Sequence, residues 1–216
     1  MPSNADRRPL RIAISFGATH AQLTTLLARQ RIEEPETPVA LSEVAPAEQI
    51  AGLKDRRYDL GFTLDAGAEQ GLKMQPLWHD ELAVALPARS PLLAYPVIPL
   101  PVLTGYPMIM WHPDACAAMY RHAVALLDAA AITPQIEAHA KSFSFMATLV
   151  AAGYGIGFAA RSWIDAARGA GVVARPFVGD AEVLTTYVLT VRSHASSEAL
   201  RFIERALATQ GSSVHY

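Results

Sequence analysis

The chain has 216 residues, of which 51% are hydrophobic and 18% are charged, a composition typical of a globular protein with one large core or two smaller ones. The formal net charge is −2, and the 18 Lys and Arg residues are scattered along the sequence, which argues against a surface that holds a phosphate backbone. No apolar run approaches the about 20 residues needed to cross a bilayer, and the N-terminus lacks the apolar region of a secretion signal, so we expect a cytoplasmic protein.

The first half of the sequence alternates short apolar strands with amphipathic helices. Leu10 to Ser15 is predicted to be a buried strand followed by a turn at Phe16 and Gly17, and Pro46 stands where it can be the first residue of a helix. Such alternation is typical of a parallel sheet covered by helices, in which ligands lie at the carboxyl ends of the strands. The expected elements are strands at 10–15, 39–44, 58–64 and 82–86 and helices at 20–31 and from 46 to about 57.

The second half repeats this pattern after a proline-rich run, Pro91 to Pro101, which we interpret as the passage into a second lobe. Asp114 is expected to be the N-cap of the helix that follows the strand Pro107 to Trp111. Two α/β lobes are therefore predicted. The expected strands of the second half lie at 107–111, 136–140, 156–160, 172–176 and 185–191, and the expected helices at 115–131, 144–152, 162–168 and 197–209.

Three glycines at alternate positions, Gly153, Gly155 and Gly157, stand between an apolar helical run and an apolar strand. A dinucleotide-binding fingerprint needs G-x-G-x-x-G after a strand and before a helix, whereas the order here is helix, glycines, strand. We therefore predict a structural role. Gly153 ends the helix in the left-handed conformation, and Gly155 and Gly157 let the next strand approach its neighbours closely.

Several segments resemble, in the same order, those of LysR-type transcriptional regulators. LVAAGYGIGFAARS is similar to the signature LVAAG-x-GI-x-L-x-P-x-S, and RIAISFG resembles the start of the family's effector-binding domain. VALSEV, GLKDRRYDLGF, GLKMQPLWHDELAVALP and SPLLA resemble further family segments, so the resemblance covers about Leu10 to Leu207. The chain departs from the family pattern at Pro46, where members that handle aromatic acids often carry a hydroxyl residue, at Ser90, which replaces a His, and at Ala159-Ala160, where a proline is usual.

The resemblance implies an α/β fold of two Rossmann-like subdomains joined by two crossover strands, as in type 2 periplasmic binding proteins, with a small effector in the cleft between them. Residues 10–87 plus 192–216 are expected to form subdomain I, residues 88–191 subdomain II, and residues 1–9 a disordered linker or the remnant of one. The family's N-terminal winged helix-turn-helix is absent from this sequence. We therefore expect the effector-sensing domain of a LysR-type regulator, either truncated or excised from a longer protein; a natural stand-alone protein is the less favoured alternative.

The resemblance also implies the partners of this domain. A small organic effector, aromatic or carboxylated, is expected to change how the subunits of a homodimer or tetramer pack. Side-by-side antiparallel packing of the helix at 20–31 on the helix at 115–131 of a partner is the expected route to the dimer. DNA would be bound only through the separate winged domain, and no membrane is involved.

The predicted effector-binding residues lie in the loops at the carboxyl ends of strands. Free backbone N–H groups at helix N-termini suit an anion such as a carboxylate, although Asp114 and Thr19 could instead cap their own helices. Aromatic walls and a few hydroxyl groups complete the site, which the resemblance places at the cleft. The predicted set is Ser15, Phe16, Gly17, Ala18, Thr19, Pro46, Thr63, Trp111, His112, Ser142 and Phe143.

Catalytic and metal-binding patterns are weak in this sequence. His112, Cys116 and His122 could suggest a metal site, and a His-x-x-x-Cys pair could share one face of a helix, but a third and a fourth metal ligand are not evident. No metal or cofactor is therefore expected. The single cysteine cannot form an internal disulfide. G-x-S-x-G, H-E-x-x-H and P-loop motifs are missing from the sequence, so we expect a protein that is not an enzyme. The alternatives are a solute-binding protein of the same fold and an enzyme on that scaffold.

Overall fold

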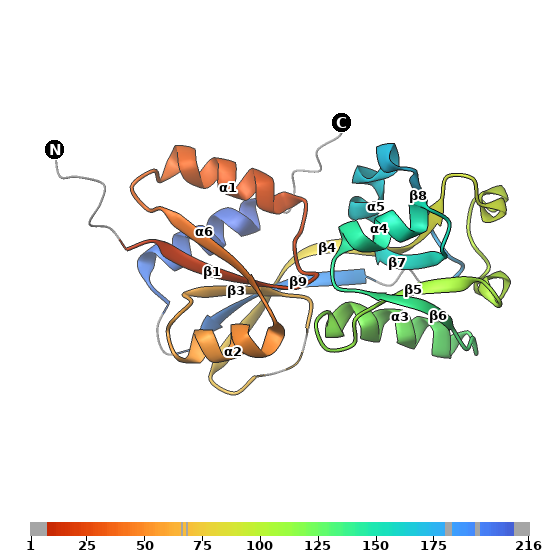
Figure 1. Cartoon of the computed structure of the whole chain (residues 1–216). Helices are drawn as coiled ribbons and strands as arrows, with labels where there is room; N and C mark the ends of the chain where they lie inside the picture. Colours follow the sequence, from red (N-terminus) through yellow and green to blue (C-terminus); the bar gives the residue numbers. More distant parts are fainter. Residues whose placement is uncertain (1–7, 66, 68, 180–182, 193–194, 210–216) are drawn as a thin grey trace. The chain divides into compact units, whose positions relative to one another are not determined.

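The computed structural model describes residues 8–65, 67, 69–179, 183–192 and 195–209, so the first seven residues of the expected linker lie outside it. The chain divides into two compact units (Figure 1): unit 1 is Met1–Trp78 with Thr185–Tyr216, and unit 2 is His79–Leu184. Two strands, β4 (Leu72–Pro87) and β9 (Val183–Val191), run from one unit into the other. This organisation confirms the expected α/β fold class. The division falls within β4 and β9, whereas the expected boundaries stand at their ends, because each strand contributes residues to both units.

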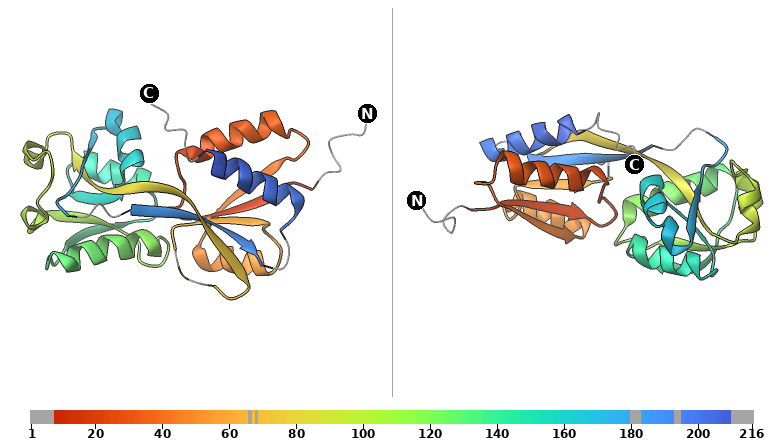
Figure 2. Two further views of the ribbon diagram at one scale, coloured as in Figure 1. Left: turned by 180° about the vertical axis from the view of Figure 1, so that it is seen from behind. Right: turned by 90° about the horizontal axis from the view of Figure 1, so that it is seen from above.

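Unit 1 is a mostly parallel sheet covered by helices on both faces. Its strand order is β2-β1-β3-β9, with β1 parallel to both β2 and β3 and with β9 antiparallel to β3. Helices α1 and α6 pack against each other on one face and α2 covers the other (Figures 1 and 2). The elements of unit 1 are β1 (Leu10–Ser15), α1 (Gln22–Glu33), β2 (Val39–Val44), α2 (Pro46–Lys54), β3 (Leu60–Thr63) and α6 (Ser197–Ala208).

Unit 2 repeats the parallel arrangement. Strand β5 is parallel to β6 and to β7, and the second half of β4 pairs antiparallel with β7 and β8. Helix α3 lies on one face, and α4 and α5 lie on the other (Figure 1). The elements are β5 (Pro107–Trp111), α3 (Ala117–Ala129), β6 (Gln135–Ala140), α4 (Phe143–Ala151), β7 (Ile156–Ala160), α5 (Arg161–Ala166), β8 (Val172–Arg175) and the 3₁₀ turns η1 (Pro91–Ala94), η2 (Leu100–Leu103) and η3 (Arg168–Ala170).

Two tryptophans occupy the interior, one in each unit, and both find a partner for the indole N–H. Trp78 is 1% exposed, and its Nε1 donates to Thr209 Oγ1 at 3.0 Å. Trp111 is equally buried, and its Nε1 donates to the Phe158 carbonyl at 2.7 Å. Because a buried indole costs free energy unless its N–H is hydrogen-bonded, these bonds fix where each ring can sit.

Strand β4 is longer than the strand predicted at 82–86, because it already begins at Leu72. The second half of the strand is marked by an apolar run. The first half lacks such a run because it contains the polar residues Lys73 and Gln75 and the proline Pro76. The first half remains extended because it lies in the unit 1 sheet beside β9, where the Arg192 N–H donates to the Gly71 carbonyl at 3.0 Å. Sequence pattern alone therefore revealed only the buried half.

The glycine prediction is confirmed in unit 2. Gly153 has a φ of +83° and follows α4, which it ends in the left-handed conformation. A Cβ placed on Gly155 would lie 2.5 Å from the Pro107 carbonyl oxygen, and one on Gly157 would lie 2.8 Å from Met146 Sδ. Strand β7 thus depends on missing side chains to reach both β5 and α4.

Substitution of these glycines should separate the cost of a side chain on left-handed backbone from the cost of a side chain where two strands approach closely. Gly155→Ala should lower the free energy of unfolding by about 1–3 kcal/mol because backbone must move, and Gly153→Ala should lower it by about 1–2 kcal/mol through its left-handed backbone. Gly169→Ala is the control, because a Cβ there meets nothing within 4 Å, and it should change stability by less than about 0.5 kcal/mol. Urea unfolding measures all three, and equal losses in the three variants would contradict the close-packing argument.

Helices α1 and α6 are fastened by a buried carboxylate. Glu34, at the C-terminus of α1, is 4% exposed and accepts hydrogen bonds from Arg201 and, at 3.2 Å, from Arg205. Thr37 donates to the same carboxylate at 3.0 Å. The bonds from Arg201, with those from Thr37 and Arg205, lower the pKa of Glu34 to about 2 against the opposing effect of desolvation.

The lowered pKa predicts how stability depends on pH. A carboxyl group whose pKa is about 2 in the folded chain and 4.5 in the unfolded chain stabilises the fold above about pH 4.5, and this contribution is lost as the pH falls toward 2. Glu34→Gln should therefore be destabilised relative to the parent near neutral pH, and the difference should shrink between pH 4.5 and 2. The exposed Glu204 of α6 provides the control substitution Glu204→Gln. A difference that is constant from pH 7 to about 2.5 would contradict the assignment.

Candidate functional site

The carboxyl edge of the unit 1 sheet brings together the predicted residues at the ends of β1 and β3. Ser15 pairs in register with Val44, so β1 and β2 end at the same edge. Ser15 is buried, and its hydroxyl donates to the Phe62 carbonyl at 3.2 Å. Thr63 is also buried, and its hydroxyl accepts from the backbone N–H two residues further on, at 3.1 Å. Both hydroxyl groups thus hold the strand ends and the turns that follow.

The turn Phe16–Thr19 follows β1 at this edge. Gly17 has a φ of +82°, a conformation that favours glycine, and the Phe16 N–H donates to the carbonyl at the end of β2 at 3.1 Å. Thr19 is exposed at the end of the turn. The alternative that Thr19 is the N-cap of the next helix is wrong: α1 begins only at Gln22, two residues later than predicted, with Ala21 at its N-cap position.

The third loop at this edge leads into α2. Pro46 is the first residue of the helix, as predicted, and Ala45 at the N-cap position provides no side-chain bond. Sequence reasoning missed Gln49, which is 1% exposed and whose Nε2 donates to the Ala13 carbonyl at 2.9 Å and to the Phe62 carbonyl at 2.8 Å. A polar residue on the apolar side of an amphipathic helix was the available signal. These two hydrogen bonds connect α2 to β1 and β3 next to the strand ends of the candidate site.

In unit 2, the predicted residues Trp111 and Phe143 also lie at the carboxyl edge of the sheet, where β5 ends and α4 begins. A third ring, Trp163 of α5, joins them: its centroid lies 5.9 Å from that of Trp111 and 5.7 Å from that of Phe143. Trp111 is buried and its indole N–H is occupied within the unit, whereas Phe143 and Trp163 are half-buried. The aromatic wall expected from the sequence therefore includes Trp163, which carried no recognisable motif.

His112 shapes the loop between β5 and α3. Its Nδ1 accepts from the backbone N–H groups of Asp114 and Ala115, each at 3.3 Å. The prediction that Asp114 is the N-cap is wrong, because α3 begins at Ala117 with Cys116 at the N-cap position. The histidine side chain takes the donors of the turn, and the chain needs two more residues before it becomes helical.

Ser142 caps α4 at the same edge. Its hydroxyl oxygen accepts from the Phe145 N–H at 3.3 Å and lies 3.2 Å from the Ser144 hydroxyl. Ser142 and the neighbouring Lys141 are both exposed. This cap, one cation and the half-buried ring of Phe143 form a group that can contact a small anion with an apolar ring.

Each unit therefore collects its own share of the predicted site at one edge. In unit 1 the structure brings together the strand ends at Ser15 and Thr63, the turn after β1 and the start of α2. In unit 2 it brings together the strand end at Trp111, the loop at His112 and the start of α4. These groups supply hydrogen bonds, ring faces and backbone N–H groups, which suit the binding of a ligand.

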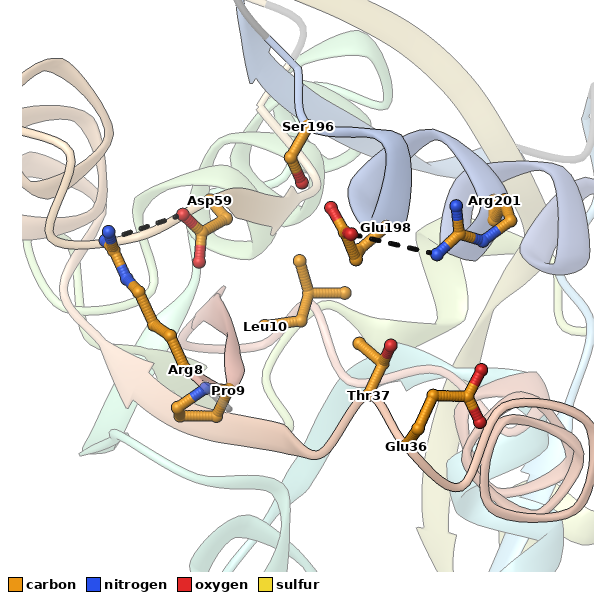
Figure 3. A pocket seen from close by; sticks show the side chains of 9 residues that line it. All are labelled: Arg8, Pro9, Leu10, Glu36, Thr37, Asp59, Ser196, Glu198 and Arg201. Atoms are coloured by element: carbon orange, nitrogen blue, oxygen red, sulfur yellow. Dashed lines mark ion pairs between the residues drawn. The ribbon is translucent and has the colours of Figure 1, made fainter. Parts of the chain in front are cut away.

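A pocket of about 450 Å³ lies at the opposite, amino edge of the unit 1 sheet (Figure 3). Figure 3 shows two ion pairs in its lining, Arg8 with Asp59 and Arg201 with Glu198 on the same helix, each at 3.9 Å. Its charged groups largely neutralise one another, and its lining includes no carboxyl end of a strand and no predicted residue of the candidate site. Its lining residues are Arg8, Pro9, Leu10, Glu36, Thr37, Asp59, Ser196, Glu198 and Arg201.

Within the described ranges, His, Cys, Asp and Glu side chains form no group of three or more that could hold a metal ion. Cys116 is buried, with its Sγ 3.3 Å from the Lys141 carbonyl. In the same ranges, none of the helices has both the length and the apolar character needed to cross a membrane.

Comparison with proteins of known sequence gives two regulators among the curated matches. The chain is 27% identical over 152 residues to the probable cat1 operon transcriptional activator of Acinetobacter lwoffii, an alignment that covers 69% of this chain and 50% of that protein. The chain spans about half the length of the curated relatives it matches. Those relatives are transcriptional regulators.

Comparison with solved structures shows the same fold in effector-binding domains. The effector binding domain of QuiR in complex with shikimate superposes with a TM-score of 0.83 at 19% identity, covering 95% of this chain and 98% of that one. The BenM effector binding domain with its effector benzoate superposes with a TM-score of 0.81 at 19% identity, covering 92% and 90%. The sequence pattern of the LysR substrate binding domain matches residues 3–211, and the chain therefore belongs to the LysR substrate binding domain family, with its type 2 periplasmic-binding-protein-like fold.

Proposed function

We propose that this chain is the effector-sensing domain of a LysR-type transcriptional regulator and that it binds a small organic molecule through the loops at the carboxyl edges of its sheets. The observation that carries the proposal is that each unit gathers hydroxyl groups, aromatic rings and helix N-termini at this edge. Open α/β sheets hold their ligands at the carboxyl ends of strands. Membership of the LysR substrate binding domain family supports the same role.

The chemistry of the two edges favours an aromatic or carboxylated effector. Several side-chain hydroxyl groups are already occupied by the backbone, which leaves backbone N–H groups and the cation of Lys141 to meet a polar ligand. The rings of Phe16, Phe143 and Trp163 offer apolar faces. The ligands named for the domains of QuiR and BenM, shikimate and benzoate, are both carboxylates, which supports this ligand class.

The role of the whole protein follows from the family. We propose that effector binding is coupled to DNA binding by a separate winged helix-turn-helix domain, in the cytoplasm and without chemical turnover of the effector. The curated relatives, about twice as long as the aligned part, are transcriptional regulators, which supports a regulatory rather than an enzymatic or transport role. A solute-binding protein and an enzyme on this scaffold have no specific observation in their favour.

A homodimer is the expected form of the domain, and exposed apolar residues support specific surfaces for it. Ile32 on α1 is 80% exposed, and Leu41 on the adjacent edge strand β2 is 42% exposed. In unit 2, Ile136 is 43% exposed on the other edge strand, β6, beside α3. We propose that α1 with β2 of one subunit packs on α3 with β6 of another, because an edge strand and exposed apolar side chains both gain from coverage.

The dimer proposal predicts the effect of one substitution. Ile32→Asp should shift the mass measured by sedimentation or light scattering from two chains to one at micromolar concentration, because an unpaired charge would be buried in the interface. Val178→Asp, at a residue that is 57% exposed away from these elements, should leave the mass unchanged. A parent chain that runs as a single subunit at this concentration would contradict the proposal.

The effector proposal is tested by thermal unfolding against a panel of aromatic acids, amino acids and carboxylates. A ligand at about 100 times its dissociation constant should stabilise the chain by roughly 2.7 kcal/mol, and it should be recovered unchanged. Ser142→Asp keeps a capping oxygen but adds a negative charge, so it should weaken binding of a carboxylate by about tenfold or more.

The matched control for this experiment is Ser90→Asp. Ser90 also caps a turn of unit 2, accepting from the Leu92 N–H at 3.2 Å, but it lines a pocket with Pro107 at the amino end of β5, away from the carboxyl ends of β5 and β6. Equal effects of the two substitutions would count against the carboxyl edge as the site. Chemical conversion of a bound ligand would contradict the sensor and favour the enzyme.

A further inference from the structure

A second pocket of unit 1 lies on the side of α6 opposite to the pocket drawn in Figure 3. It is a cavity of about 330 Å³ between that helix and the strands β4 and β9. Glu198 and Arg201 of α6 line the pocket of Figure 3, whereas Leu200 and Ile203 line this one, so the helix separates the two. Residues two apart on a strand share a face, which brings the side chains of alternate residues of β4 and β9 into the same cavity.

The lining of this pocket has an unbalanced positive charge. Lys73 of β4 and Arg192, directly after β9, both line it, and among the described lining residues there is no Asp or Glu. The Nε of Arg192 donates to the Leu72 carbonyl at 2.9 Å, which holds the guanidinium at the rim and leaves its two terminal nitrogens for another partner. Two cations that share a cavity repel each other unless an anion lies between them.

A threonine of β9 adds a hydroxyl group to the same cavity. Thr190 is only 6% exposed and is one of the lining residues. A hydroxyl group at the wall of a cavity can donate a hydrogen bond to an anionic ligand. Gln75 of β4 adds a half-buried amide beside it.

The opposite wall of the cavity is apolar. Leu200 is 50% exposed although it stands on α6 above the sheet, and Ile203 lies one turn further along. A ligand with a small apolar body would cover Leu200, and its anionic group would reach the two cations and the Thr190 hydroxyl. The volume is within the range of small-molecule sites, about 300–1,000 Å³.

We propose that this cavity is a second binding site of the chain, for a small organic carboxylate with an apolar body. Lys73 and Arg192 neutralise the carboxylate, the hydroxyl of Thr190 donates to it, and Leu200 with Ile203 contacts the apolar part. The site lies within unit 1 and shares none of the predicted effector-binding residues, so it does not depend on the proposed function.

The test uses the whole chain carrying Ser142→Asp, which suppresses carboxylate binding at the carboxyl edge. Benzoate, inorganic phosphate and benzyl alcohol are titrated separately into ¹⁵N-labelled protein, and the backbone amide signals of Thr190, Arg192 and Leu200 are followed. Benzoate should shift these signals, and Lys73→Gln should weaken its binding by about tenfold. Thr190→Val should weaken binding several-fold, and Arg31→Gln, which removes an exposed cation of α1, should leave it unchanged.

Each other outcome would overturn the proposal. Unmoved signals of Thr190 and Arg192 at ~10 mM benzoate, far above the dissociation constant of a useful site, would mean that the cavity takes no carboxylate. Benzyl alcohol that binds as tightly as benzoate would remove the role of the cations, and phosphate that binds as tightly would remove the role of the apolar wall. Because Lys73 is exposed, Lys73→Gln remains a valid test even if Thr190→Val fails to fold.

Discussion

Parallel strand pairing is the constraint on which the rest of the structure depends. β1 lies between two parallel neighbours, β2 and β3, and β5 lies between β6 and β7 in the same way. Parallel neighbours must end at the same edge, and the chain can return to the other edge only through a helix across a face of the sheet. This geometry alone carries the loops after Ser15 and Thr63 to one edge of unit 1 and the loops after Trp111 and Ala140 to one edge of unit 2.

Groups at these edges also serve the fold. The Ser15 hydroxyl, the Trp111 indole N–H and the Ser142 hydroxyl each bond to backbone of their own unit. A ligand must therefore use groups that these bonds leave open, such as backbone N–H groups and ring faces. Removal of one of these side chains would change local stability together with binding, which is why a substitution that keeps the cap, such as Ser142→Asp, reports on binding more cleanly than truncation.

Helix α6 separates two pockets that differ in their balance of charge. On one side, acidic and basic side chains neutralise one another, and Arg201 also meets Glu34, the carboxylate that fastens α1 to α6. On the other side, the cations of Lys73 and Arg192 face no described carboxylate in the pocket lining. A charge balanced within the protein contributes to its stability, whereas unbalanced positive charge in a cavity favours an anionic ligand.

The sequence by itself determined the order and type of the main elements, the left-handed Gly153 and the close approach at Gly155, because apolar periodicity and glycine chemistry are local properties. It also indicated which loops lie at the carboxyl edges. Only the tertiary structure decided that His112 rather than Asp114 engages the turn before α3, that the first half of β4 is a strand, and that Trp163 packs by Trp111. These outcomes depend on hydrogen bonds and ring contacts made after folding, in several cases between residues far apart in the chain, and no periodic pattern in the sequence encodes such contacts.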